Sequence, residues 1–244
     1  MHTFVYLCAM KIVEIFLPDN FNLKKMRILR NIIPTTIVAL SILSCKSAAE
    51  TFIVPQNPQE AIQTLLDGNA RYANQTKTNP HCTLERIAQT APHQEPFAAV
   101  VGCSDSRVPV ELLFDCGIGD IFVIRTAGNN VGNDNVMGSI EYAVEHLGVK
   151  VLMVLGHESC GGVTSAIQGG EHHGAVGNLL HHIAGDIPEY AGKLEELDNA
   201  IRVHTNVQVS DIMANPVIAE KVSSGQLEVV AAHYDVDTGK VELL

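Results

Sequence analysis

The chain has 244 residues, 46% of them hydrophobic, and a formal net charge of −11. The first 49 residues carry six Lys/Arg and two Asp/Glu, a net charge of +4, which leaves −15 on residues 50–244. A domain this acidic is not expected to bind nucleic acid or anionic lipid surfaces. Residues 50–244 are numerous enough to bury much of their surface around one core, so we expect a single domain there.

The first predicted element is an export signal at 26–49. Arg27 and Arg30 precede an apolar stretch of about a dozen residues, and SAA at 47–49 fits the rule of small residues at a cleavage site. This pattern predicts a bacterial-type signal peptide and a periplasmic or secreted domain. Residues 1–25 would then derive from an upstream start codon.

Two alternatives to a cleaved signal stay open. Cys45 would allow lipoprotein processing, but Leu43 is a poor residue two positions before a lipidated cysteine. A membrane anchor is the other alternative, although the apolar stretch is short for a span of about 20 residues. We therefore favour export and expect no membrane association after cleavage.

A helix is predicted from about Pro58 to Gln75, where Ala61, Leu65 and Tyr72 are apolar and a proline lies near the start. Short apolar runs then alternate with helical patterns. Strands are predicted at 97–103, 120–124 and 149–156, and helices at 134–147, 160–168 and between about 194 and 224. Residues 227–243 predict two strands around an Asp-Thr-Gly turn.

These elements predict an α/β fold: a single domain with a central, mostly parallel β-sheet flanked by helices, an N-terminal helical arm and a C-terminal strand hairpin. The runs at 97–103 and 149–157 are continuously apolar, as is typical of central parallel strands. Their carboxyl ends would lie side by side, at the edge where open α/β sheets place their sites.

Two motifs follow these runs, CSDSRVP at 103–109 and GHESCGG at 156–162. Together they offer Cys103, His157 and Cys160 as soft metal ligands. Two thiolates and one imidazole suit zinc, and three protein ligands leave the fourth tetrahedral position open, as in catalytic sites. The alternatives are buried structural cysteines or a Cys103–Cys160 disulfide, which would leave the nearby carboxylate and guanidinium without a joint role.

The chain resembles the β-class carbonic anhydrases, whose pattern is C-x-D-x-R followed tens of residues later by H-x-x-C. The similarity runs from about Asn57 to the C-terminus and includes FDCGIGDIFVIRTAGN at 114–129 and GSIEYAVEHLGV at 138–149. The resemblance implies reversible hydration of CO2 to bicarbonate by a homodimer or tetramer. It also implies one Zn2+ per subunit, bound by Cys103, His157 and Cys160, and a catalytic dyad of Asp105 and Arg107.

The residues are consistent with a mechanism of this kind. Zinc lowers the pKa of bound water to roughly 7, so that hydroxide forms near neutral pH. Asp105 would accept the hydroxide's hydrogen bond, while Arg107 pairs with the carboxylate and keeps it off the metal. If that pair breaks, Asp105 becomes the fourth zinc ligand and the site is closed.

Family members inhibited by bicarbonate use a tryptophan three residues before the first zinc cysteine. Val100 stands at that position, and the chain has no tryptophan, although Arg125 matches an arginine of those members. We therefore predict an open site without that inhibition, and leave acid-driven closure open.

Other polar or small residues near the motifs have less specific interpretations. Gly161 and Gly162 would let backbone N–H groups approach the substrate, or would simply allow close helix–strand packing. Four histidines have two alternative interpretations, a proton shuttle or solvated surface; they are His172, His173, His181 and His182. Cys82 and Cys116 could pair in an oxidising compartment, but sequence alone does not decide this.

Two other functions stay open. The same fold and ligands can hydrolyse carbon disulfide or carbonyl sulfide, which assays of those substrates would reveal. A non-catalytic zinc or thiol-redox protein would have a four-ligand site or a Cys103–Cys160 disulfide, and it would not need Arg107.

Overall fold

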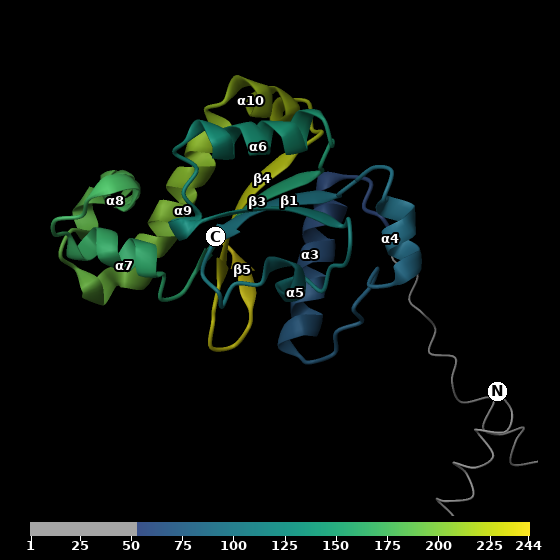
Figure 1. Ribbon diagram of the computed structural model, residues 1–244, viewed down its shortest axis with the longest axis horizontal. Coiled ribbons are helices and arrows are strands. Elements are labelled where there is room, and N and C mark those ends of the chain that lie inside the picture. The colour runs from purple at the N-terminus through teal and green to yellow at the C-terminus, as the bar shows by residue number, and fades with distance from the viewer. Residues whose placement is uncertain (1–52) are drawn as a thin grey trace, which may run out of the picture. The chain divides into compact units, whose positions relative to one another are not determined.

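A five-stranded sheet forms the centre of the structure, a computed structural model that describes residues 53–244 (Figure 1). The strand order is β2-β1-β3-β4-β5. β1, β2, β3 and β4 run parallel, and β5 is antiparallel to β4. The strands are β1 (Ala98–Cys103), β2 (Ile121–Thr126), β3 (Val151–His157), β4 (Glu228–Tyr234) and β5 (Val241–Leu243).

The two central strands are buried along their whole length. β1 reads AAVVGC and β3 reads VLMVLGH, and every residue of both is buried. Apolar side chains on both faces need cover on both sides, which explains why the sheet lies between two layers of helices. The pairing of Ala98 with Val151 and of Gly102 with Leu155 brings the carboxyl ends of the two strands side by side.

The helices are α3 (Pro58–Ala73), α4 (Leu84–Thr90), α5 (Val110–Leu113), α6 (Asp134–Glu145), α7 (Gly161–Gln168), α8 (Gly174–Asp186), α9 (Leu197–Met213) and α10 (Pro216–Ser223). α3 and α5 pack on one face of the sheet. α6, α10 and the end of α9 pack on the other (Figure 1). α7, α8 and the start of α9 enclose a third apolar cluster around Cys103 and Cys160.

The predicted fold class is confirmed, including the parallel sheet, the N-terminal helix and the C-terminal hairpin. Three helices were not predicted: α4, the four-residue α5 and α8. α4 has no buried residue, so it shows no apolar face in the sequence. α8 contains Gly174, Gly177 and Gly185, which weaken the helical pattern around His181 and His182.

Among the described helices we find none whose length and apolar content would suit a membrane span. The predicted signal peptide at 26–49, the segment 1–25 and Cys45 lie outside the described residues, so these predictions remain as they stand.

Gly68 marks a close contact between α3 and the segment after α5. A Cβ atom at Gly68 would overlap the carbonyl oxygen of Phe114. We expect Gly68→Ala to lower the free energy of unfolding by about 1–3 kcal/mol, the usual cost of overpacking. Gly138→Ala is the matched control because Gly138 also lies within a helix but has no atom within 4 Å of an added Cβ. Urea unfolding of both variants would test this, and equal effects would contradict it.

Asp115 ties the end of α3 to the loop that follows it. Its carboxylate, 1% exposed, accepts hydrogen bonds from Arg71 Nε at 2.7 Å and from the backbone N–H groups of Thr78 and Asn79, each at 2.9 Å. Burial alone would raise the pKa of Asp115, but these hydrogen bonds outweigh burial and lower the pKa. The ionised carboxylate is therefore favoured in the folded protein.

This pKa predicts how stability depends on pH. A carboxyl group whose pKa is lower in the folded state stabilises the protein above its unfolded pKa of about 3.9, and this contribution is lost as pH falls through the folded value. We expect Asp115→Asn to lower the free energy of unfolding by about 1–3 kcal/mol at neutral pH. The difference from wild type should shrink in acid, below about pH 4. Urea unfolding at both pH values, with the exposed Asp67→Asn as control, would test this; a difference independent of pH would contradict it.

Candidate metal centre

Three buried side chains meet at the carboxyl edge of the sheet. Cys103 ends β1, His157 ends β3, and Cys160 precedes the first turn of α7. Their ligating atoms lie within 4.8 Å of one another, and the residues are 4%, 0% and 1% exposed. Within residues 53–244 no other group of three or more Cys, His, Asp or Glu residues is arranged in this way.

The orientation of His157 fits a metal ligand. Its Nδ1 lies 2.9 Å from the carbonyl oxygen of Glu158. Because a carbonyl only accepts, Nδ1 carries the hydrogen and Nε2 presents a lone pair. Nε2 is buried and has no hydrogen-bond partner. An unpartnered buried nitrogen is costly, whereas a metal ion at this position would satisfy it.

The two sulfur atoms also favour a cation. Cys103 Sγ accepts hydrogen bonds from Asp105 N at 3.4 Å and Gly128 N at 3.3 Å. The hydrogen bond from the Cys160 side chain is the main cause that lowers the pKa of Cys103 to about 4, against the effect of burial. The same contact, together with burial, raises the pKa of Cys160. Without a cation the pair therefore favours one thiolate beside one thiol, whereas a divalent cation would favour two thiolates. Two thiolates and one imidazole are a donor set that zinc prefers.

A carboxylate lies beside this cluster and is held by an arginine. Arg107 donates to Asp105 through Nε (3.0 Å to Oδ1) and Nη2 (2.7 Å to Oδ2). The backbone N–H of Arg107 also donates to Oδ1, at 2.9 Å. The hydrogen bond from the guanidinium is the main reason that the pKa of Asp105 lies far below its usual range. Asp105 Oδ2 is 4.0 Å from His157 Nε2, so the paired carboxylate still borders the space between the ligands.

Arg107 also connects the two sequence motifs. Its Nη2 donates to the carbonyl oxygen of Ser159 at 3.1 Å, between His157 and Cys160. The structure therefore brings together all five residues predicted to act as ligands or as the dyad. Their catalytic and ligand roles remain predictions.

Arg125 supports the segment that carries Asp105. From β2, its Nε donates to the carbonyl oxygen of Cys103 at 3.0 Å, and its Nη2 donates to that of Asp105 at 2.7 Å. The resemblance matched Arg125 to an arginine of the family members that bicarbonate inhibits. Val100 is fully buried within β1. The absence of bicarbonate inhibition stays a prediction.

Gly161 and Gly162 form the first turn of α7, directly after Cys160. An added Cβ at Gly161 would meet no atom within 4 Å, and one at Gly162 would meet Gly128 N at 3.4 Å. Close helix–strand packing therefore does not explain Gly161. A role for these N–H groups on the substrate side remains a prediction.

The remaining polar residues lie outside the cluster. His172 and His181 line a pocket of about 300 Å³ between α7 and α8. His182 is in α8, and its Nδ1 lies 2.9 Å from Asn130 Nδ2. None of the four cysteines within the described residues forms a disulfide, so neither disulfide considered from the sequence is present; they are Cys82, Cys103, Cys116 and Cys160.

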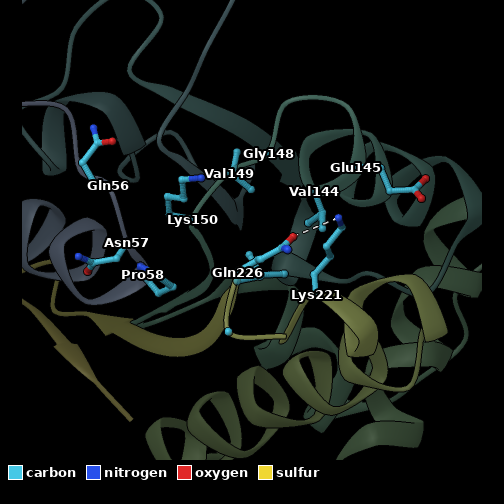
Figure 2. Close-up of a pocket in the computed structure, with 12 residues that line it drawn as sticks. Gln56, Asn57, Pro58, Val144, Glu145, Gly148, Val149, Lys150, Lys221 and Gln226 are labelled. Carbon is cyan, nitrogen blue, oxygen red and sulfur yellow. Dashed lines mark hydrogen bonds between the residues drawn. The ribbon is translucent and has the colours of Figure 1, made fainter. Parts of the chain in front are cut away.

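A second pocket, of about 310 Å³, lies at the opposite edge of the sheet (Figure 2). Lys150 and Leu227 line it and directly precede β3 and β4, so it opens at the amino ends of the strands. Lys221 donates to Gln226 within it, at 3.2 Å. This pocket is separate from the cysteine–histidine cluster, which lies at the carboxyl ends.

Comparison with known proteins gives a consistent result. Residues 98–241 match the family model described as carbonic anhydrase. The carbonic anhydrase of Mycolicibacterium smegmatis is 41% identical over 194 residues, which cover 77% of this chain and 93% of that protein. Carbonic anhydrase 2 of Mycobacterium tuberculosis is 36% identical over 195 residues, with the same coverage.

Solved structures show the same similarity in three dimensions. A tetrameric β-carbonic anhydrase from Sordaria macrospora has a TM-score of 0.61 and 28% identity, covering 75% of this chain and 95% of that one. A Coccomyxa β-carbonic anhydrase in complex with acetazolamide also has a TM-score of 0.61 and 28% identity, covering 75% of this chain and 86% of that one.

Proposed function

The chain belongs to the β-class carbonic anhydrase family, and on that premise we propose that it catalyses the reversible hydration of CO2 to bicarbonate with one zinc ion per subunit. The observation that carries this proposal is the buried, unpartnered Nε2 of His157 beside two cysteine sulfurs. Cys103, His157 and Cys160 would hold the ion. When bound, zinc would supply a Lewis acid that activates water near neutral pH.

Asp105 and Arg107 would orient the attacking water. Oδ2 of Asp105 accepts one hydrogen bond from Arg107 Nη2 and has a further lone pair to accept one from the water. Arg107 holds the carboxylate through two parallel hydrogen bonds, which fix its plane. The pairing keeps Asp105 ionised and prevents it from becoming a fourth ligand. We therefore propose the open arrangement as the active one.

Stopped-flow measurement of CO2 hydration by the zinc-loaded protein would test this function. We expect turnover that rises with pH around neutrality, as the activated water loses its proton. Carbon disulfide and carbonyl sulfide should be assayed in parallel. Hydrolysis of either without CO2 hydration would replace the proposal with the sulfur-substrate alternative, and a zinc-loaded protein inactive on all three would contradict an active enzyme.

We also propose a homodimer or tetramer, because the Sordaria macrospora relatives are described as tetrameric. Sedimentation equilibrium would distinguish these states, and a monomer would contradict the proposal.

The sequence pattern of residues 26–49 supports export of a processed domain, 50–244, which would be periplasmic or secreted. Mass spectrometry of the protein from a periplasmic fraction should give an N-terminus near residue 50. A lipidated Cys45 would indicate the alternative.

A further inference from the structure

His204 is a fully buried histidine that is connected to Cys103 of the metal centre through Gly128. It belongs to α9 and lies far from both ligand motifs in the sequence. Its Nε2 lies 2.8 Å from the carbonyl oxygen of Gly128. Since this carbonyl only accepts, Nε2 carries the hydrogen and donates it. The buried ring therefore holds one specific peptide group.

That peptide group adjoins the hydrogen bond to the metal-site sulfur. Gly128 donates its N–H to Cys103 Sγ at 3.3 Å and accepts from His204 through its carbonyl. Its φ of 65° is left-handed, and a Cβ would lie 2.8 Å from Ile183 Cδ1, so the position favours glycine. Glycine dihedrals are soft, and the direction of this N–H therefore depends on groups that fix the adjacent carbonyl.

A polar cluster lies against the other side of the His204 ring. Its Nδ1 lies 3.1 Å from Asp186 Oδ2, at the end of α8, without forming a hydrogen bond, so this contact is attractive when the ring is protonated. Gln208 Nε2 donates to the same carboxylate oxygen at 2.8 Å, and Gln208 Oε1 accepts from Val131 N at 2.7 Å. α8 and α9 are thus joined to the loop that contains Gly128.

We propose that His204 is a positioning residue for the metal centre, which fixes Gly128 so that its N–H remains directed at the Cys103 thiolate. A hydrogen bond to a metal-bound thiolate stabilises its charge and orients the ligand. This inference rests on the proposed zinc function. It assigns no contact with substrate to His204.

The test measures zinc release from the loaded enzyme to a chromogenic chelator. In His204→Gln, the amide nitrogen can occupy the place of Nε2 and still donate to Gly128. In His204→Asn, the shorter side chain places its nitrogen near Nδ1 and does not reach that carbonyl. Loss of a group that orients a ligand typically costs 10–100-fold in metal affinity. We expect release at least about 10-fold faster from His204→Asn, and within about 2-fold of wild type from His204→Gln.

A second readout reports the thiolate directly. In cobalt-substituted protein, the thiolate-to-metal absorption band should shift in His204→Asn and stay unchanged in His204→Gln. Ile212→Ala, a fully buried substitution on the same helix, controls for lost stability. Equal zinc release and equal spectra in both His204 variants and wild type would overturn the inference, as would release from Ile212→Ala as fast as from His204→Asn.

Asp186→Asn keeps the experiment decisive if His204→Asn does not fold. The asparagine retains an oxygen for Gln208 but removes the charge beside His204 Nδ1. We expect zinc release to accelerate by a factor of about 3 to 10, which is less than for His204→Asn because Asp186 does not contact Gly128 itself. Release at the wild-type rate would overturn the inference. A wild-type protein that binds no zinc would instead contradict the proposed function.

Discussion

Cys160→Ala is expected to abolish stoichiometric zinc binding and to reduce kcat/KM for CO2 hydration by at least about 10³-fold. A bound metal contributes several kcal/mol to the stabilisation of a transition state, and each 1.36 kcal/mol is roughly tenfold in rate. Removing one of three protein ligands leaves two that come from different strands. Zinc content by atomic emission and hydration by stopped flow would measure both effects.

Cys116→Ala is the matched control for this variant. Cys116 is also a buried cysteine without a disulfide. Burial is the main reason that its pKa is raised, so its thiol stays protonated and unreactive in the core. It packs with the cluster that contains Phe114 and Leu113, away from the metal centre. We expect it to retain zinc and activity with a modest loss of stability. Full zinc content in Cys160→Ala would show that the ligand assignment is wrong.

Asp105→Asn should preserve zinc content and lower kcat on the order of 10²- to 10³-fold, within the usual contribution of a positioned acid–base group. The amide is nearly the same size as the carboxylate, but it can no longer offer two acceptor oxygens to Arg107 and water together. One parallel hydrogen bond to the guanidinium is lost, and so is the charge that orients the nucleophile.

Asp198→Asn provides a comparison on a second Asp–Arg pair. Asp198 accepts from Arg202 at 2.8 Å on the exposed side of α9, and its other contact is with His233. Since that pair is solvent-exposed, its loss should cost little. Comparable reductions in kcat for the two variants, or loss of zinc from Asp105→Asn, would argue against an orienting role for Asp105.

The sequence predicted the parts of the site that depend on local pattern. Continuous apolar runs identified β1 and β3, and the residues that end them, Cys103 and His157, followed from the direction of parallel strands. The spacing of His157 and Cys160 placed the third candidate ligand at the start of α7. These features each depend on a short segment of chain.

The contacts that the sequence could not supply join distant segments. His204 is 76 residues from Gly128, and nothing in the mixed polar and apolar sequence of α9 indicates which carbonyl a buried histidine will contact. Arg125 could be placed at the edge of the sheet, but its two partners could not: its guanidinium binds two carbonyl oxygens at the end of β1. Such pairings depend on packing angles between elements, which the pattern of residue types does not specify.

The three residues that could hold a metal ion come from the ends of two strands and the start of a helix, separated by up to 57 residues along the chain. An ion held by all three would act as a cross-link between segments that are far apart in the unfolded chain. Folding and metal binding would then be thermodynamically linked. Each tenfold rise in free zinc above the dissociation constant would add about 1.4 kcal/mol to the free energy of unfolding. The free zinc concentration of the compartment would then determine the stability of the fold as well as the fraction of enzyme that carries zinc.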